Sequence, residues 1–223
     1  MIILVSGSRE YSDYNQVQKV LEDNFSEACF DEDIPVLYHG GARGVDTWAG
    51  DLANQWGIDT EIRYADWDKY GYAAGCIRNG EMLDAAIAHA LQKNTTLTVL
   101  IFWDGESRGT KDMIHHCIER KQSFKVYFPS HMKLHILNRR NMRPDNISTC
   151  DIMLVDRRTV WGNPFVMRSE SDREWACDQF EEYAQDRLQR EPRWLDKLRG
   201  KHLLCWCAPK RCHAETLMRL ANN

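Results

Sequence analysis

Three apolar runs of the sequence are each followed at once by a loop of small residues and then by a helical pattern. The runs are residues 1–5, 35–38 and 97–103. Near-continuous apolar strands are typical of parallel sheets that are covered by helices on both faces. The carboxyl ends of parallel strands share one edge of the sheet, where ligands bind in open α/β folds. The sequence therefore predicts an α/β fold with a mainly parallel sheet and a ligand site where the three loops meet.

Strand and helix patterns alternate from the first residue to about residue 130. Short apolar runs bounded by turn residues indicate strands, and longer segments with an apolar residue every three or four positions indicate helices. The expected strands span residues 2–5, 36–38, 60–64, 97–103 and 124–127, and the expected helices span residues 13–29, 46–56, 73–92 and 110–121. This order predicts right-handed crossovers between parallel strands.

The pattern changes at residues 129–131, and we place a domain boundary there. Beyond it the elements become fewer and shorter. The expected strands span residues 153–155 and 202–207, and the expected helices span residues 170–189 and 213–221. The sequence thus predicts two domains, with the larger sheet in residues 1–130 and a smaller α+β domain in residues 131–223.

The loop after the second strand, residues 39–46, reads His-Gly-Gly-Ala-Arg-Gly-Val-Asp. Glycine lets the backbone approach a ligand closely, and the N–H groups at the start of a helix attract an anion such as phosphate. Each of the three loops also carries an arginine. The alternative explanation is an ordinary tight turn from strand to helix. The expected ligand-binding residues in the loops are Gly7, Ser8, Arg9, Gly40, Gly41, Ala42, Arg43, Gly44, Ser107, Arg108, Gly109 and Thr110.

Four separated motifs give the first half of the chain a family resemblance. Gly-Ser-Arg at 7–9, Gly-Gly-Ala-Arg-Gly-Val-Asp at 40–46, Ala-Gly-Cys-Ile-Arg-Asn at 74–79 and Ser-Arg-Gly-Thr at 107–110 occur in that order. Together they resemble the YspA-related branch of the SLOG superfamily, which includes cytokinin-activating phosphoribohydrolases, DprA DNA-processing proteins and sensors of nucleotide-derived signals. Over about residues 1–130, this resemblance implies a Rossmann-like fold and a nucleotide-like small-molecule ligand, with Asn79 among its contacts. It also implies homo-oligomers, which are frequent in the superfamily.

The resemblance further suggests a reaction at an N-glycosidic bond. In the phosphoribohydrolases a Gly-Thr helix start holds the phosphate, while an arginine and a glutamate act on the bond. Gly109-Thr110 is present here, but the glutamate is missing or replaced by Asp112, which is one methylene shorter. The reaction needs a carboxylate to stabilise an oxocarbenium-like sugar or to activate water. The candidate catalytic residues are therefore Asp112, Arg78 and Asp46, although Asp46 has the alternative role of capping its helix.

Two classes of function follow from these motifs. The first is an enzyme that hydrolyses or transfers at the N-glycosidic bond of a nucleotide. The second is a non-catalytic protein that senses or sequesters a nucleotide signal of the ADP-ribose type. A DNA-processing factor is a weaker alternative, because acidic residues outnumber basic ones within residues 1–130 and repel a polyanion. Nucleic acid is therefore not a favoured partner.

Composition sets the cellular context that we expect. The formal net charge is −4, and apolar and charged residues make up 43% and 28% of the chain, as in ordinary globular proteins. The sequence contains no run of about 18 apolar residues, so we expect no membrane span and no membrane partner. The first strand starts at the N-terminus, and the eight cysteines are irregularly spaced. We therefore expect a cytoplasmic protein without a disulfide scaffold and without a cofactor.

The second half carries a different signature. Residues 157–165 read Arg-Arg-Thr-Val-Trp-Gly-Asn-Pro-Phe, and residues 205–213 read Cys-Trp-Cys-Ala-Pro-Lys-Arg-Cys-His. Over about residues 135–222 these resemble a small uncharacterised domain that occurs in phage and bacterial proteins, and the resemblance implies no activity. The Trp161 loop has two interpretations: a stacking platform for a flat base beside Arg157 and Arg158, or a hydrophobic plug between the domains.

Cys205, Cys207, Cys212 and His213 have three interpretations. They are small buried residues under the last helix, ligands of a tetrahedral zinc ion, or a reactive thiol with a nearby base. A C-x-C pair is tighter than the usual zinc spacing, and the side chains of the adjacent Cys212 and His213 are expected to diverge. We therefore predict a cysteine-lined core and no metal site.

Overall fold

The computed structural model of the chain describes residues 1–28, 35–130, 134–139 and 152–222. The last residue of the helix expected at 13–29 and the first residues of the domain expected at 131–223 lie outside this part. The chain folds into two compact units, whose described residues fall within 1–130 and 134–222. Each unit is treated separately below.

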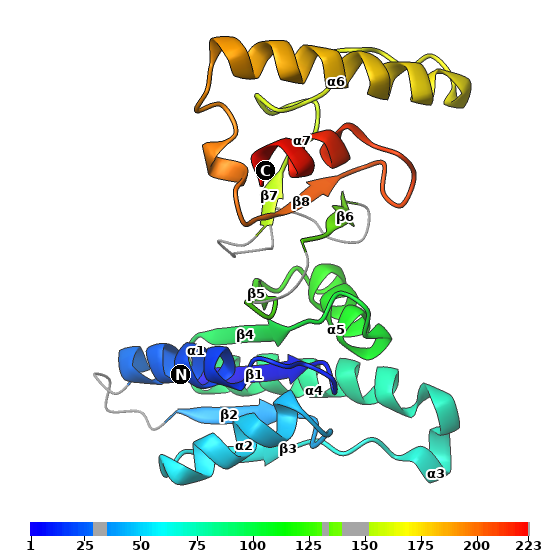
Figure 1. The fold of residues 1–223 in the computed structure, drawn as a ribbon. Helices are drawn as coiled ribbons and strands as arrows, with labels where there is room; N and C mark the ends of the chain where they lie inside the picture. The colour runs from blue at the N-terminus through cyan, green and yellow to red at the C-terminus, as the bar shows by residue number, and fades with distance from the viewer. Residues whose placement is uncertain (29–34, 131–133, 140–151, 223) are drawn as a thin grey trace. The chain divides into compact units, whose positions relative to one another are not determined.

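The first unit is built on a five-stranded parallel sheet with the strand order β3-β2-β1-β4-β5 (Figure 1). Its strands are β1 (Ile2–Gly7), β2 (Val36–His39), β3 (Asp59–Ile62), β4 (Leu97–Phe102) and β5 (Phe124–Tyr127). Every pairing is parallel, with Ile2 opposite Val36 on one side and Leu97 on the other. The expected α/β fold with a parallel sheet is therefore confirmed. The strand order reverses between β1 and β4, which is where ligands bind in such sheets.

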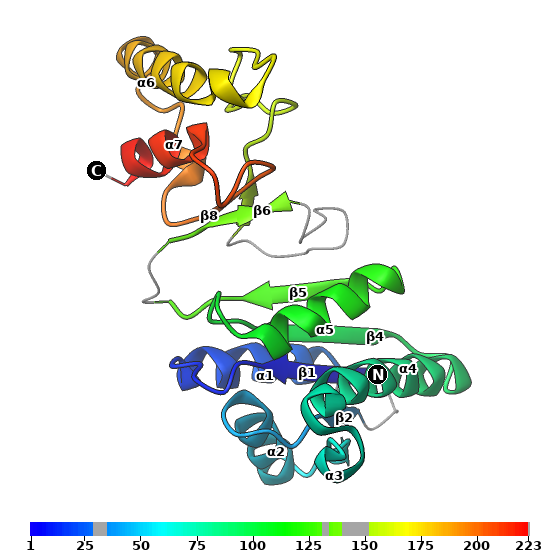
Figure 2. The same ribbon diagram turned by 90° about the vertical axis from the view of Figure 1, so that its right-hand side faces the viewer.

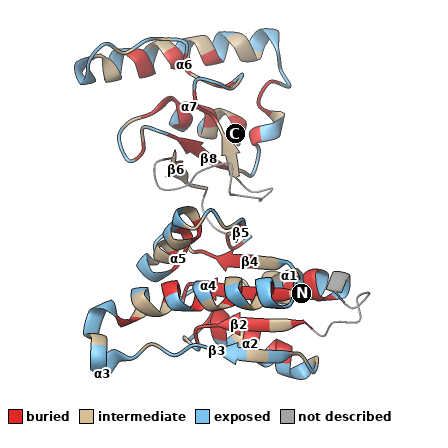
Figure 3. Cartoon of the chain, turned by 180° about the vertical axis from the view of Figure 1, so that it is seen from behind, coloured by how far each residue is buried: buried red, intermediate tan, exposed pale blue. Residues whose placement is uncertain are grey.

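Helices cover both faces of this sheet. Its principal helices are α1 (Tyr14–Ala28), α2 (Val45–Gln55), α4 (Ala74–Gln92) and α5 (Arg108–Glu119). The pair α1 and α2 packs together in front of the sheet in Figure 1, and the pair α4 and α5 packs together in front of it in Figure 3. The central strand β1 is buried along almost its whole length, as its uninterrupted apolar sequence requires.

The second unit contains a smaller parallel sheet with the order β6-β8-β7 (Figure 2). Its elements are β6 (Ile136–Asn138), β7 (Ile152–Leu154), α6 (Arg173–Arg190), β8 (His202–Cys205) and α7 (His213–Ala221). The helix α7 packs against both β8 and α6. Leu203 and Leu217 from these elements are buried in one core with Phe180 of α6. The expectation of a second, smaller domain of strands and helices is confirmed.

Trp161 belongs to the core of the second unit. Its side chain is 9% exposed and packs with Trp194, whose carbonyl oxygen accepts a hydrogen bond from the Trp161 indole at 3.0 Å. An indole with its N–H and its ring faces occupied in this way does not stack on a base. The interpretation of the Trp161 loop as a stacking platform is therefore wrong, because its ring packs among residues of its own unit.

Four short elements in the described part of the chain were not expected from the sequence: β6, the helix α3 (Trp67–Tyr70), the 3₁₀ turn η1 (Gly71–Ala73) that follows it, and the 3₁₀ turn η5 (Asp196–Leu198). Asp66 caps α3, because its side chain accepts the Lys69 N–H at 2.9 Å, and the helix has no buried residue. A single exposed turn leaves no apolar period to detect. None of the helices in the described part of the chain has both the length and the apolar character that a membrane crossing requires.

Replacing Phe102 by alanine should lower the free energy of unfolding of the first unit by about 3–5 kcal/mol. The ring is fully buried and stacks on Tyr127 with centroids 5.2 Å apart, so its removal leaves a cavity in the core. Chemical denaturation followed by circular dichroism measures the change. Leu91→Ala is the control, because Leu91 is 75% exposed on α4 and its loss should cost less than about 0.5 kcal/mol. Equal midpoints for the two variants would contradict this core.

Candidate functional site

A cavity of about 700 Å³ lies where β1, β2 and β4 end. Three loops line it, one after each strand, together with the first turn of α4 and the segment that contains α3. The predicted residues that line the cavity are Gly7, Arg9, Ala42, Arg43, Asp46, Arg78, Asn79, Ser107, Arg108, Gly109 and Thr110. Ser8, Gly40, Gly41 and Gly44 lie in the same loops without lining the cavity. The loops thus meet at the switch point of the sheet, which is the place between β1 and β4 where the strand order reverses, as their position in the sequence predicts.

Asp46, the second residue of α2, fastens two of the loops to each other. Its buried carboxylate accepts backbone N–H groups from Gly7 at 3.3 Å, Gly40 at 3.0 Å and Ala42 at 3.3 Å. Burial raises the pKa of the Asp46 carboxyl, and Arg78 and the three amides oppose that effect. Both carboxylate oxygens are engaged with the protein itself. Asp46 therefore acts as a structural clamp, and its candidate catalytic role finds no support in this geometry.

Arg78 lies over the loop that follows β2. Its Nη1 atom is 3.7 Å from the Asp46 carboxylate and donates a hydrogen bond to the carbonyl of Arg63 at 3.3 Å. A Cβ atom on Gly40 would stand 1.1 Å from the same Nη1, so glycine is required there for the guanidinium to fit. Burial lowers the pKa of Arg78 and Asp46 opposes it. The Nε atom is buried without a partner in the described part of the chain.

Ser8 joins the loop after β1 to the start of α5. Its hydroxyl is 3.2 Å from that of Thr110 and accepts the N–H of Asp104 at 3.1 Å. Ser107 caps α5 by accepting the Thr110 N–H at 3.4 Å. The N–H groups of Arg108 and Gly109, in the first turn of α5, have no carbonyl partner within the helix. Both residues line the cavity, and nothing lies within 4 Å of the position that a Cβ atom of Gly109 would take.

Exposed charges form the rim of the cavity. Arg43 forms an ion pair with Glu10, a residue that the sequence did not single out. Within residues 1–28 and 35–130, neither Arg9 nor Arg108 has an ion-pair partner, and both side chains are exposed. These two arginines are therefore available to an anionic ligand.

Asp112 lies next to residues of the cavity but does not line it. Its carboxylate accepts a hydrogen bond from the Asn79 side chain at 3.0 Å and lies 3.4 Å from Nε2 of His116. Asn79 also donates to the carbonyl of Gly109 at 3.1 Å. Asp112 projects from α5 towards α4 and is not among the residues that line the cavity. The structure thus brings Asn79 and Gly109 together at the site and leaves Asp112 behind them.

Two aromatic residues complete the cavity, and sequence reasoning did not assign them to the site. Trp67 of α3 and Tyr72 of the turn η1 line it, and both side chains are exposed. Exposed aromatic side chains beside a cavity are typical of surfaces that stack on flat rings. The sequence feature that could have identified them is the occurrence of two aromatic residues in a short segment that lacks the apolar period of a buried helix.

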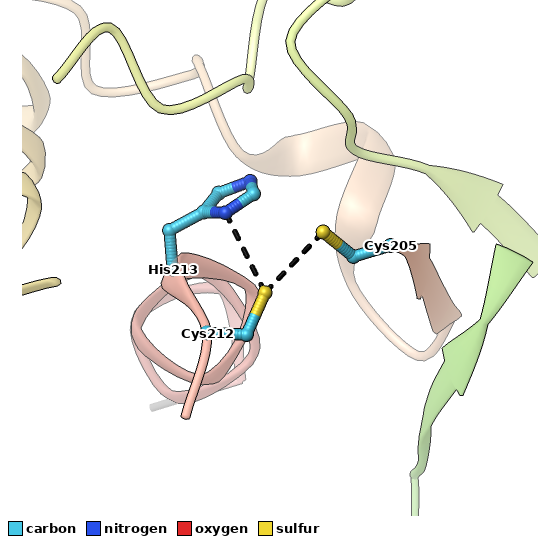
Figure 4. Close-up of side chains that lie close together, drawn as sticks. All are labelled: Cys205, Cys212 and His213. Atoms are coloured by element: carbon cyan, nitrogen blue, oxygen red, sulfur yellow. Dashed lines mark hydrogen bonds between the residues drawn. The ribbon is translucent and has the colours of Figure 1, made fainter. Parts of the chain in front are cut away.

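A second cavity, of about 380 Å³, lies in the second unit beside Cys205, Cys207, Cys212 and His213. The sulfur of Cys212 is 3.3 Å from that of Cys205 and 3.6 Å from Nδ1 of His213 (Figure 4). Hydrogen bonds with the neighbouring thiols, and then with Arg173, lower the pKa of the Cys207 thiol. The expectation that the side chains of Cys212 and His213 diverge is wrong, because they converge on one point.

Comparisons with known proteins agree with the division into two units. The family model described as YspA, cpYpsA-related SLOG family matches residues 1–70, and the model described as a domain of unknown function, DUF4326, matches residues 137–223. The chain is also 31% identical over 129 residues to the Gene 61 protein of Mycobacterium phage D29. The matched segment covers 54% of this chain and 87% of that protein. No solved structure matches the chain.

Replacing Asp46 by asparagine should lower the free energy of unfolding of the first unit by about 1–3 kcal/mol. Asparagine keeps only one acceptor oxygen. Its NH₂ group would therefore face another donor, either a backbone N–H or Arg78, in the place of the second carboxylate oxygen. Thermal and chemical denaturation measure the loss. Asp51→Asn on the exposed face of the same helix is the matched control and should leave stability unchanged. A variant at position 46 as stable as this control would refute the clamp.

Proposed function

The chain belongs to the YspA, cpYpsA-related SLOG family through its first unit and carries a DUF4326 domain in its second, and on this premise we propose that the first unit binds a nucleotide-derived, phosphate-bearing ligand. The observation that carries the proposal is the cavity at the ends of β1, β2 and β4. It combines the N-terminus of a twelve-residue helix, α5, with two arginines that have no ion-pair partner in the described part of the unit. This combination favours a phosphate group.

The phosphate is expected at the first turn of α5. Nothing lies within 4 Å of the position that a Cβ atom of Gly109 would take, so the backbone there is open to close approach. Arg108 at the same turn and Arg9 in the loop after β1 supply positive charge from two sides. Trp67 and Tyr72 supply exposed rings for the base, and this makes a nucleotide a better fit than an inorganic anion.

Binding without cleavage is the function that the geometry supports best. Of the two predicted carboxylates, Asp46 is occupied by three backbone amides and Arg78, and Asp112 lies outside the cavity. Three further carboxylates line the cavity. Glu10 is paired with Arg43, Asp104 accepts the backbone N–H groups of Glu106 and Ser107 at 3.0 and 2.7 Å, and Glu106 is exposed. Cleavage of an N-glycosidic bond needs a carboxylate held against the sugar. We therefore favour a sensor or sequestering protein over a hydrolase.

Isothermal titration calorimetry with ADP-ribose and nucleoside 5′-monophosphates tests the binding site. Arg108→Gln should weaken binding about tenfold or more, because a charge-assisted hydrogen bond to phosphate is lost. Gly109→Val should abolish binding without loss of stability, since its side chain enters open space and valine suits a helix better than glycine. Arg193→Gln, an exposed site in the second unit, is the control for loss of charge.

Gly109 is a better probe than Gly41. Gly41 has a φ of 63°, and a Cβ atom there would stand 2.5 Å from the ring of Tyr64, so its replacement disturbs the backbone as well as the ligand. Unchanged affinity in a folded Gly109→Val protein would refute the site. Chromatography of the same mixtures measures released base, and steady release by the wild type would replace the binding proposal with a hydrolase.

A further inference from the structure

We propose that Cys205, Cys207, Cys212 and His213 of the second unit bind one zinc ion. Three of their ligand atoms already lie within 4.8 Å of one another: the sulfurs of Cys205 and Cys212 and a ring nitrogen of His213. All three residues are buried. Thiolate and imidazole ligands in a tetrahedral set select zinc over magnesium or calcium, which prefer oxygen ligands.

The distances between these atoms suit a tetrahedral zinc shell. With Zn–S bonds of about 2.3 Å and Zn–N bonds of about 2.0 Å, two sulfurs stand about 3.8 Å apart, and a sulfur and a nitrogen about 3.5 Å apart. The observed separations are 3.3 Å for Cys205 and Cys212 and 3.6 Å for Cys212 and His213 (Figure 4). These two separations are therefore within a few tenths of an ångström of those in a metal shell.

The orientation of His213 is that of a metal ligand. Its Nε2 atom is 2.7 Å from the carbonyl oxygen of Val155, which can only accept a hydrogen bond. Nε2 must therefore carry the proton, and Nδ1 of the neutral ring presents its lone pair to the sulfur of Cys212. The ring is also fixed by Phe180, edge to face at 5.0 Å. Ligating histidines are held in this way, with the second ring nitrogen donating to a carbonyl or carboxylate.

Cys212 is held at the N-terminus of α7. Cys212 is the N-cap of α7, and its sulfur accepts the backbone N–H of Glu215, while the Glu215 side chain accepts the Cys212 N–H at 2.8 Å. A helix N-terminus stabilises negative charge on a capping group. The fold thus supplies a donor to the sulfur, as a zinc-bound thiolate requires.

Cys207 is the fourth ligand in this proposal. Cys207 stands two residues beyond the end of β8 and lines the same cavity as Cys205, Cys212 and His213. Arg173 lines this cavity as well. Three thiolates and one imidazole around Zn²⁺ leave one negative charge, which the guanidinium of Arg173 balances.

Metal content of the full-length chain tests the proposal. The protein is purified without chelator and with any affinity tag removed, and zinc is counted by mass spectrometry. We expect about one equivalent per chain, with a loss of about tenfold or more in Cys205→Ser, Cys212→Ser and His213→Ala. Cys177→Ser is the matched control, since Cys177 is a buried thiol that lines the same cavity outside the cluster. Zinc-free protein, or a disulfide between Cys205 and Cys212 seen by intact mass, would overturn the assignment.

Cobalt exchange of the wild-type protein gives a readout that does not depend on the folding of any variant. Tetrahedral Co²⁺ bound by thiolates shows intense d–d bands and a sulfur-to-cobalt charge-transfer band. We expect both bands, and the spectrum of hydrated Co²⁺ alone would refute the site. In Cys207→Ser the charge-transfer band should fall by about one third as one of three thiolates is lost. An unchanged band in that variant would remove Cys207 from the ligand set.

Discussion

The cleft of the first unit depends on one buried carboxylate. An unpaired carboxylate inside a protein is costly, and it persists only where hydrogen bonds and an opposite charge compensate for the lost water. Asp46 has both, since three backbone amides and Arg78 surround it. Because those amides belong to the end of β1 and to the loop after β2, satisfying this charge also fixes these two segments to each other. The shape of the cavity is thus set by a buried group at its inner wall.

The second unit has a different constraint, because it has few residues with which to build a core. A unit of this size buries a smaller fraction of its surface than a large domain does. Its central strand β8 ends at Cys205, and α7 starts at His213, directly after its cap Cys212. A metal ion at that junction would join the strand, the following loop and the helix at one point, and His213 would extend the connection to Val155 beside β7. Structural zinc often supplies stability in small domains.

The sequence pattern predicted the bounds of those strands and helices in which buried and exposed residues alternate regularly along the element. Phe124–Tyr127 and His213–Ala221 have the expected bounds because their burial follows a simple period. The failures lie where the chain turns. Cys212 has an extended backbone, with φ −148° and ψ 145°, and His213 begins the helix, so two neighbours point the same way. Asp112 does not line the cavity, because the face of α5 that it occupies turns towards α4, and only the packing of the two helices decides this.

The hydrogen bonds of Ser8 have a consequence for which residues can be substituted in evolution. Ser8, Thr110 and the Asp104 amide connect the loops on the two sides of the switch point without using any atom at the rim. The groups that would recognise a ligand, such as Arg9 and Arg108, are exposed and carry little of the fold. If the first unit binds a ligand as proposed, ligand preference and stability reside in different residues. Evolution could then exchange the exposed arginines and aromatics, and with them the ligand, while the buried hydrogen bonds stay unchanged.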